Sequence, residues 1–235
     1  MSLEAFTDAD VVFFVQTHGR DLDRLDWLLA HVRAHYPFAR IEVVGDGDRG
    51  VAEVVAKRYS ADYTSGDALF GLANGGQIIR RMLMKFTDKP GRWLVKVDTD
   101  TGVYRRFAGL PRDTGVYGTL QMLPMADRAG ECWSVQGGCI IVTRTAAVAL
   151  LDKGLLDDPR LASAPNETWA LSHLVRETRV AKGLTSEDWV LAWACGQAEV
   201  WMYSHPEVMS RWQAHVENVG DRYAVTHPCK SCRLL

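Results

Sequence analysis

Two aspartates, one residue apart, close a short apolar segment of the chain: Asp98 and Asp100 follow Trp93–Val97 ("WLVKV"). In an extended segment, residues i and i+2 point the same way, so both carboxylates would face one ligand. Because like charges this close repel each other, the pattern calls for a cation between them. Hard divalent cations take oxygen ligands, and Mg²⁺ in particular takes one or two carboxylates together with substrate phosphates. The pattern predicts a site for a metal bound to a diphosphate; the alternative is a solvated turn in which Asp98 and Thr99 bond the local backbone.

Two histidines, each followed by proline, are candidates to complete such a metal site: His227 in "VTHPCK" and His205 in "MYSHPEV". An imidazole beside carboxylates and a diphosphate suits Mn²⁺, which accepts both oxygen and nitrogen ligands. We favour His227, because it follows a short apolar run, and keep His205 as its rival. At least one of the two is expected to be an ordinary surface histidine. The expected cofactor is Mn²⁺ or Mg²⁺.

The composition of the 235 residues excludes several classes of protein. The formal net charge of −2 argues against a nucleic-acid binder that works through a broad basic surface. No apolar run reaches the length of a membrane span, and the first twenty residues lack the pattern of a signal peptide. Five cysteines, an odd number, fit reduced thiols better than a disulfide framework. We expect a soluble, cytoplasmic protein with one domain over residues 1–235.

Strands and helices alternate in the first half of the chain. Apolar runs and helical spacing predict strands over 11–15, 39–48 and 93–97, and helices over 21–36, 51–59 and 76–86. Such alternation implies right-handed crossovers and a parallel sheet, whose ligands bind outside the carboxyl ends of the strands. The second half is mixed, with strand-like segments over 115–123 and 137–147 and helical patterns over 166–179 and 186–197. We expect a nucleotide-binding half over 9–104 and a mixed half over 105–235.

A glycine-rich turn, "GDGDRG", follows the second predicted strand and has Gly45, Gly47 and Gly50 at the spacing of a dinucleotide-binding fingerprint. Asp46 and Asp48 would bring carboxylates toward the pyrophosphate, where the fingerprint relies on backbone N–H groups. An aspartate that hydrogen-bonds a base or a ribose from the end of a strand suits Asp46 better. An oxidoreductase that binds NAD at this turn stays as an alternative.

Taken in order, several segments resemble the nucleotide-sugar glycosyltransferases of the GT-A fold. The segments are "VVFFVQTHGR", "IEVVGDGD", "NGGQIIRR", "WLVKVDTDT", "QGGCIIVTR", "SEDWVLAW" and "VTHPCK". The resemblance implies one α/β domain with a Rossmann-like parallel or mixed sheet flanked by helices, and a mixed half on the acceptor side. It also implies donor-binding residues at Thr17, His18, Asp46, Arg80 (or Arg81), Asp98, Gly137 and Gly138, and metal ligands at Asp98, Asp100 and His227.

The activity that this resemblance implies is metal-dependent transfer of a hexosyl-type sugar from a nucleoside-diphosphate sugar to an unknown acceptor. We favour a UDP-sugar as the donor. On the acceptor side, Asp188 would be the base that deprotonates the incoming hydroxyl if the reaction inverts the configuration, with Glu187 as its substitute. "TSED" also matches a helix capping pattern, so Asp188 serves as a base only if it is not a cap.

Two further alternatives use the same residues. "DTDTG" is similar to the motif of haloacid-dehalogenase-like phosphohydrolases, in which Asp98 would be the nucleophile and Asp100 its partner. Those enzymes carry the motif on the first strand and have Thr or Val where this chain has Gly102. The other alternative is a non-catalytic protein that keeps the fold and binds a nucleotide or a sugar.

Overall fold

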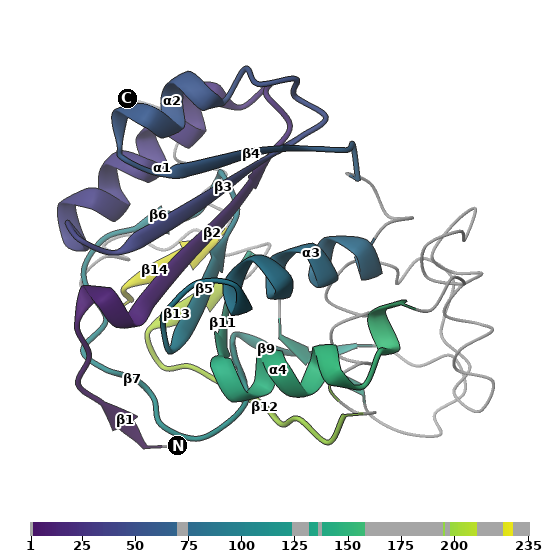
Figure 1. Cartoon of the computed structure of the whole chain (residues 1–235). Helices are drawn as coiled ribbons and strands as arrows, with labels where there is room; N and C mark the ends of the chain where they lie inside the picture. Colours follow the sequence, from purple (N-terminus) through teal and green to yellow (C-terminus); the bar gives the residue numbers. More distant parts are fainter. Residues whose placement is uncertain are drawn as a thin grey trace.

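The computed structural model of the chain describes residues 2–69, 75–123, 132–135, 138–157, 195, 198–210 and 223–227. Within these residues, a seven-stranded sheet in the order β12-β8-β11-β5-β2-β3-β4 forms the centre of the fold (Figure 1). Its strands are β2 (Val11–Thr17), β3 (Arg40–Asp46), β4 (Asp62–Gly66), β5 (Trp93–Val97), β8 (Val116–Gly118), β11 (Cys139–Thr143) and β12 (Met202–Ser204).

The sheet is mixed. The strands β2, β3, β4 and β5 run parallel to one another, whereas β11 runs antiparallel to both of its neighbours, β5 and β8. The edge strand β12 pairs in parallel with β8. The expected α/β fold, with a parallel or mixed sheet flanked by helices, is confirmed at this level. Strands from the second half of the chain extend the same sheet that the first half begins.

Helices cover both faces of this sheet (Figure 1). On one face, α1 (Leu22–His35) and α2 (Glu53–Arg58) share a core with the inward side chains of β2 and β3. On the other face, α3 (Gly75–Thr87) and α4 (Arg144–Asp152) pack over β5 and β11. None of the helices in the described part is long and apolar enough to span a bilayer.

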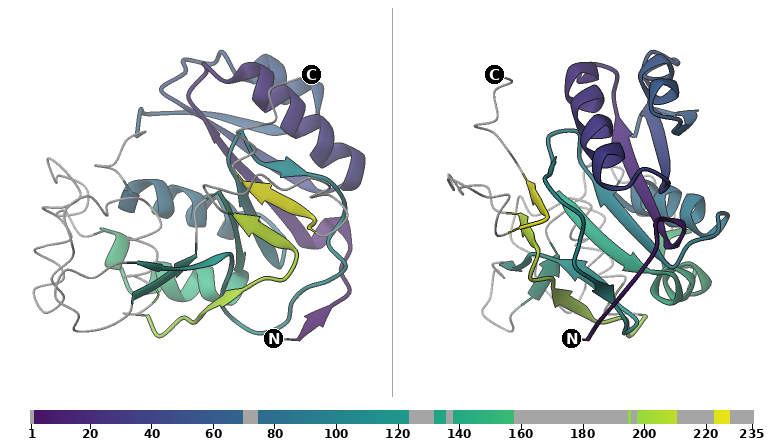
Figure 2. Two further views of the ribbon diagram at one scale, coloured as in Figure 1. Left: turned by 180° about the vertical axis from the view of Figure 1, so that it is seen from behind. Right: turned by 90° about the vertical axis from the view of Figure 1, so that its left-hand side faces the viewer.

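Smaller elements complete the fold. A three-stranded sheet of β13 (Val208–Ser210), β14 (Val225–His227) and β6 (Gly102–Val103) packs into the same core as α1 (Figure 2). The remaining elements are the pair β1 (Leu3–Glu4) and β7 (Leu110–Pro111), the pair β9 (Leu120–Leu123) and β10 (Cys132–Val135), and the 3₁₀ turns Asp8–Asp10 and Leu155–Asp157.

The first half of the chain follows its hydrophobic pattern closely. The predicted strand over 93–97 has the bounds of β5, and the helix predicted over 21–36 is α1, which ends before Pro37. Two of the differences from the prediction have a plain reason. The strand β4 was not predicted, because "DYTSG" has little apolar character and lies at the edge of the sheet. The segment predicted as strand-like up to 147 instead becomes α4 after Thr143, whose hydroxyl accepts a hydrogen bond from Ala146 N at 3.4 Å as an N-cap.

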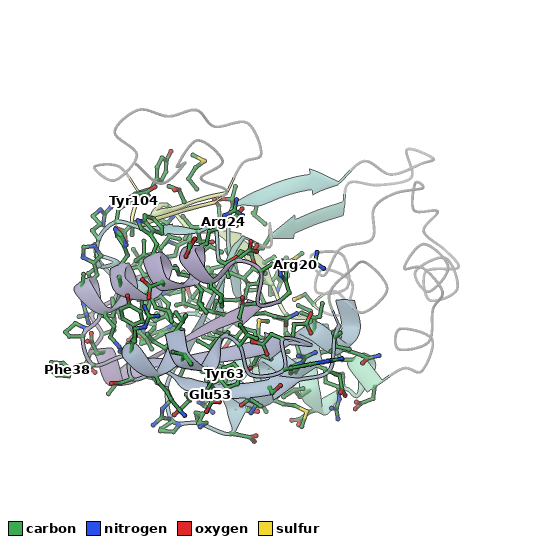
Figure 3. All side chains as sticks on the ribbon, turned by 90° about the horizontal axis from the view of Figure 1, so that it is seen from above. Arg20, Arg24, Phe38, Glu53, Tyr63 and Tyr104 are labelled. Carbon is green, nitrogen blue, oxygen red and sulfur yellow. The ribbon has the colours of Figure 1, made fainter. Side chains whose placement is uncertain are left out.

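The carboxyl ends and the amino ends of the parallel strands form two different edges of the sheet. Arg20 follows the carboxyl end of β2, and Phe38 precedes the amino end of β3; Figure 3 shows Phe38 at the left of the view and Arg20 well away from it, near the centre. In a parallel sheet, the carboxyl edge is the one where ligands bind. Thr17 and Asp46 end β2 and β3, and Asp98 follows β5, so these candidate residues lie at the carboxyl edge.

Candidate functional site

The point where the strand order reverses lies between β2 and β5. From β2 the sheet continues outward through β3 to β4, and the chain then returns to place β5 on the other side of β2. Outside the carboxyl ends of the strands at such a reversal, an open α/β sheet has a crevice suited to a ligand. Thr17 ends β2 and Asp98 follows β5, so both predicted donor-binding residues lie at this reversal.

A pocket of about 120 Å³ occupies this position. Its apolar wall comes from Phe14, from Ile78, Ile79 and Met82 of α3, and from Ile140 of β11. Its polar lining consists of Gln16, Thr17, His18, Asp46, Lys96 and Asp98. The structure thus brings four of the predicted donor-binding residues, Thr17, His18, Asp46 and Asp98, to one pocket.

The acidic motif forms a tight turn. Thr101 N donates to Asp98 O at 3.0 Å, and Asp98 N donates to Thr101 Oγ1 at 3.0 Å. The extended backbone that we assumed for Asp98 and Asp100 is therefore wrong, because Thr99 and Asp100 lie in a turn rather than in a strand. Both aspartates are half-buried. The turn, rather than strand alternation, determines how the two carboxylates are placed.

Gly138, a predicted border of the sugar pocket, lies against this turn. Its carbonyl accepts hydrogen bonds from Asp98 N at 3.2 Å and from Thr101 Oγ1 at 2.8 Å. The contact follows from the antiparallel pairing of β11 with β5, in which Cys139 lies opposite Val97. The Asp98–Thr101 turn is thereby attached to the start of β11.

A lysine that the sequence analysis did not select contributes a positive charge to the site. Lys96 Nζ lies 2.5 Å from Asp98 Oδ1, and the lysine side chain is only 5% exposed. The signal was present in the sequence: a single charged residue inside an apolar strand, two positions before Asp98, lies on the same face of β5. Lys96 therefore provides at least part of the positive charge that we expected between the carboxylates.

Asp46 is the most deeply buried acid of the pocket, with 1% of its surface exposed. Its Oδ1 accepts a hydrogen bond from Leu69 N at 2.7 Å and lies 3.4 Å from the Arg81 guanidinium. Its Oδ2 is buried and has no hydrogen-bond partner among the described residues, and the same is true of Gln16 Oε1. Because an unsatisfied buried acceptor costs about 1–3 kcal/mol, these two oxygens would be stabilised by a hydrogen-bond donor, either a water or a ligand.

The two arginines of α3 point in different directions. Arg81 reaches Asp46, as described above. Arg80, which we had named first, pairs with Asp157 and donates to Met84 Sδ at 2.9 Å, so its contacts lie away from the pocket. Arg81 is therefore the arginine of α3 that contacts a residue of the pocket, Asp46.

The glycine-rich turn is filled by the chain's own carboxylate. Asp48 accepts hydrogen bonds from Gly50 N at 3.1 Å, from Ala52 N at 2.9 Å and from the Tyr63 hydroxyl at 2.5 Å. A Cβ on Gly45 would lie 2.1 Å from Asp48 Oδ1, which explains the glycine there. The amides that a dinucleotide fingerprint offers to a pyrophosphate are thus bonded to Asp48 instead.

His18 and the two candidate metal-binding histidines have different surroundings. His18 Nε2 lies 3.1 Å from Asp21 Oδ2. His205 is buried, with its ring edge-on to Phe107 at 5.3 Å and its Nδ1 accepting a hydrogen bond from Glu207 N at 3.3 Å. His227 ends β14, which pairs antiparallel with β6 through Thr226 and Gly102. This register brings the backbone of His227 next to Thr101, directly after Asp100; the side chain of His227 lies outside the described part.

Burial lowers the pKa of His205 to about 4, an effect that the nearby Glu207 and the Gly109 backbone partly oppose. The folded state holds the imidazole neutral, whereas the unfolded chain takes up a proton below its ordinary pKa of about 6.5. The contribution of the neutral His205 to stability is therefore complete above about pH 6.5 and is lost as the pH falls toward 4. Between pH 7.5 and 5.0 we expect His205 to account for a loss of roughly 2 kcal/mol in the free energy of unfolding.

Urea denaturation at the two pH values tests this expectation. The variant His205→Gln, which cannot take up a proton in this range, should lose roughly 2 kcal/mol less than the wild-type protein between pH 7.5 and 5.0. An equal loss in both proteins would contradict the assignment of this acid sensitivity to His205.

Three of the predicted site residues lie outside the described part of the chain: Gly137, Glu187 and Asp188. Within the described residues, no group of three or more His, Cys, Asp or Glu side chains is placed to hold a metal ion. A complete metal shell there would need His227 or a substrate in addition to the acidic turn.

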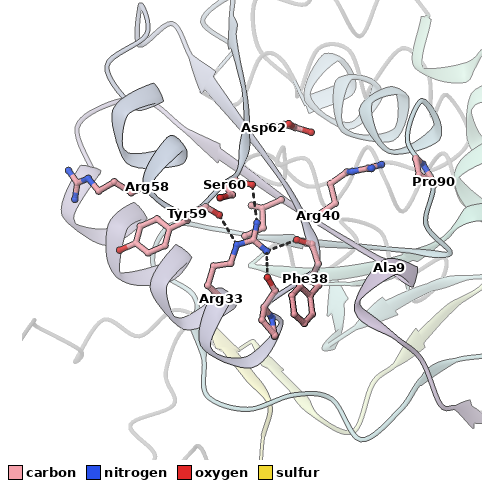
Figure 4. Close-up of a pocket in the computed structure, with 12 residues that line it drawn as sticks. Ala9, Arg33, Phe38, Arg40, Arg58, Tyr59, Ser60, Asp62 and Pro90 are labelled. Carbon is pink, nitrogen blue, oxygen red and sulfur yellow. Dashed lines mark hydrogen bonds between the residues drawn. The ribbon is translucent and has the colours of Figure 1, made fainter.

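A larger groove of about 780 Å³ lies at the opposite, amino-terminal edge of the sheet (Figure 4). Its central cation, Arg33, donates to the carbonyls of Tyr59, Ala39 and Ser60 at 2.6, 2.5 and 3.1 Å. Arg58 on its rim pairs with Asp26 at 2.8 Å. Because these arginines are already used to join the ends of α1, α2 and β3, the groove's size alone does not indicate a functional site.

Comparison with known proteins adds no relative: no family model matches the sequence, and no curated protein is significantly similar to it.

Proposed function

We propose that this protein is a metal-dependent glycosyltransferase that uses a nucleoside-diphosphate sugar, with a UDP-sugar favoured, and transfers the sugar to an acceptor hydroxyl. One observation supports the proposal most: the ends of three adjacent parallel strands surround a single pocket at the reversal of the strand order. Thr17 ends β2 and His18 follows it, Asp46 ends β3, and Asp98 follows β5. This is the position where α/β sheets bind nucleotides.

The nucleoside would occupy the pocket through its hydrogen-bond donors. The buried acceptors Asp46 Oδ2 and Gln16 Oε1 have no donors among the described residues. Ribose hydroxyls and the N–H groups of a base would supply them. The apolar wall from Phe14 and α3 would cover the flat face of the base.

Asp98, Asp100 and His227 would hold a divalent cation, Mn²⁺ or Mg²⁺. The residues fit this role in chemistry: two half-buried carboxylates lie in one turn, and β14 brings His227 to the residue after Asp100. When bound, the cation would neutralise the charge that develops on the leaving diphosphate. Gly138, which accepts hydrogen bonds from both ends of the turn, would keep it in position beside the sugar.

The acceptor side of the proposal rests on the resemblance alone. Asp188, or Glu187 in its place, would deprotonate the acceptor hydroxyl if the reaction inverts the configuration. The assignment to the GT-A fold belongs to the same proposal, and the parallel half followed by the antiparallel β11 is compatible with it. A location in the cytoplasm also belongs to this proposal. The lack of a membrane-spanning helix in the described part leaves that location open.

A thermal-shift panel tests the proposal. The ligands are UDP, GDP, ADP and NAD, each measured with and without Mn²⁺. Because a ligand that binds the folded state raises the apparent stability, we expect UDP or GDP to raise the melting temperature only when Mn²⁺ is present. A shift with NAD that is indifferent to Mn²⁺ would favour the oxidoreductase, and no shift with any nucleotide would contradict the proposal.

The variant Asp46→Asn should weaken nucleotide binding. Its amide oxygen can still accept from Leu69 N, but an NH₂ group replaces one carboxylate oxygen, and the charge facing Arg81 is lost. We expect at least a roughly tenfold loss of affinity, about 1.4 kcal/mol, for UDP or GDP with Mn²⁺ present. Isothermal titration calorimetry measures this loss. Asp26→Asn, which removes an acid from an exposed pair with Arg58, is the matched control; equal affinities in both variants would exclude Asp46 from the site.

A further inference from the structure

Lys96 is an unusual residue for its place in the fold. It lies inside β5 between Phe14 of β2 and Ile140 of β11, and its side chain is 5% exposed. An ammonium group removed from water costs several kcal/mol unless charges and hydrogen bonds compensate it. A leucine or valine would fill this position without that cost, so the charge itself requires an explanation.

Asp98 is one partner that compensates this charge. The Lys96 ammonium lies 2.5 Å from Asp98 Oδ1, and both residues line the same pocket. The Asp98–Asp100 pair carries two negative charges within three residues, and Lys96 reduces this to one. A divalent cation that approached the turn alone would meet an ammonium already bound to one of its two carboxylates, and like charges repel.

We propose that Lys96 is a positioning residue that makes the cation and the diphosphate bind together rather than one after the other. This inference rests on the proposed function. Lys96 holds Asp98 while the donor is absent and lowers the affinity of the acidic turn for a cation alone. An arriving diphosphate brings negative charge that attracts both the ammonium and the cation, so the two ligands favour each other's binding. In thermodynamic terms, Lys96 increases the coupling between them.

The test compares Mn²⁺ binding to the wild-type protein and to Lys96→Met, first alone and then with saturating UDP or GDP. The EPR signal of free Mn²⁺ measures the affinity without any activity assay. We expect Lys96→Met to bind Mn²⁺ alone at least tenfold more tightly than wild type, because Asp98 is released from its partner. The increase in Mn²⁺ affinity caused by the nucleotide should shrink by a similar factor. Equal or weaker binding of Mn²⁺ alone by Lys96→Met overturns the proposal.

Two further variants keep the test decisive. If Lys96→Met does not fold, Lys96→Gln takes its place. Its neutral amide can still donate to Asp98, and it should also bind Mn²⁺ alone more tightly than wild type. Lys57→Met, which removes a lysine from an exposed pair with Glu53, is the matched control and should bind Mn²⁺ as the wild-type protein does. Tighter Mn²⁺ binding in this control as well would assign the effect to net charge and overturn the proposal.

The outcomes separate this inference from the function on which it rests. If wild-type protein binds neither UDP nor GDP with Mn²⁺, the proposed function fails, and the coupling fails with it. If wild-type protein binds a nucleotide only with Mn²⁺, and Lys96→Met leaves the affinity for Mn²⁺ alone unchanged, the function stands and only the role of Lys96 is overturned.

Discussion

The variant Asp100→Ala is expected to lose Mn²⁺-dependent nucleotide binding by a factor of roughly 100 or more while remaining folded. Residues in the outer shell of a metal typically change its affinity by roughly 10- to 100-fold, and a direct ligand should lie at or above the upper end of that range. Asp100 occupies the turn after β5 rather than the core, so its removal should leave the sheet intact. Isothermal titration of UDP or GDP in the presence of Mn²⁺ measures the loss, and circular dichroism checks the fold.

The matched control for this variant is Asp113→Ala, which removes an exposed acid from a turn before β8. It should bind the nucleotide with wild-type affinity. If Asp100→Ala retained tight binding that depends on Mn²⁺, Asp100 would have no role as a metal ligand.

The largest effect on stability is expected from Arg33→Met. The guanidinium donates to carbonyls at the end of α1, at the start of β3 and in the turn after α2, and it is the central cation of the groove in Figure 4. A buried carbonyl left without a donor costs about 1–3 kcal/mol. Even with partial access of water to these carbonyls, we expect a loss of roughly 3 kcal/mol in the free energy of unfolding. Urea denaturation at neutral pH measures it.

Arg58→Met on the rim of the same groove is the control. Its side chain is 59% exposed and pairs with Asp26, and exposed ion pairs contribute about 0–1 kcal/mol. Nucleotide binding should be unchanged in Arg58→Met, because the groove lies at the amino-terminal edge of the sheet. Similar losses of stability in the two variants would contradict a structural role that is particular to Arg33.

Much of the first half of the chain could be predicted from the sequence, because its elements have strong hydrophobic patterns. The run at 93–97 became β5, and the helical spacing at 76–86 became α3. The convergence of Thr17, Asp46 and Asp98 on one pocket followed from the rule that the carboxyl ends of parallel strands share an edge. The edge strand β4 was missed because edge strands need little apolar character.

Finer features of the site required the three-dimensional structure. Arg80 and Arg81 are adjacent in the sequence, and only the rotation of α3 about its axis decides that Arg81 reaches Asp46. The glycine spacing of "GDGDRG" matched a dinucleotide fingerprint, yet the Asp48 carboxylate takes up the amides of that turn. The extended backbone assumed for the acidic motif was wrong because hydrogen bonds between Asp98 and Thr101 close a turn.

The contact of Lys96 with Asp98 had a weak signal in the sequence. A lysine within an apolar run still predicts a strand, and its position two residues before Asp98 was the one sign of the pairing. The structure joins this buried lysine of β5 to the first residue after the strand, beside a wall that α3 provides. The acidic turn is therefore a carboxylate pair with its own counter-ion, and the proposed donor would bind beside an ammonium as well as a metal.

The measurement that tests the central claim most directly is a crystal structure of the protein with UDP, or with GDP if the thermal-shift panel selects it, in the presence of Mn²⁺. The claim predicts the nucleoside in the pocket beside Asp46 and Gln16, and the diphosphate joined through Mn²⁺ to the turn that contains Asp98 and Asp100. A nucleotide bound elsewhere, as in the groove beside Arg33, or bound at the pocket with no metal at the acidic turn, would contradict it.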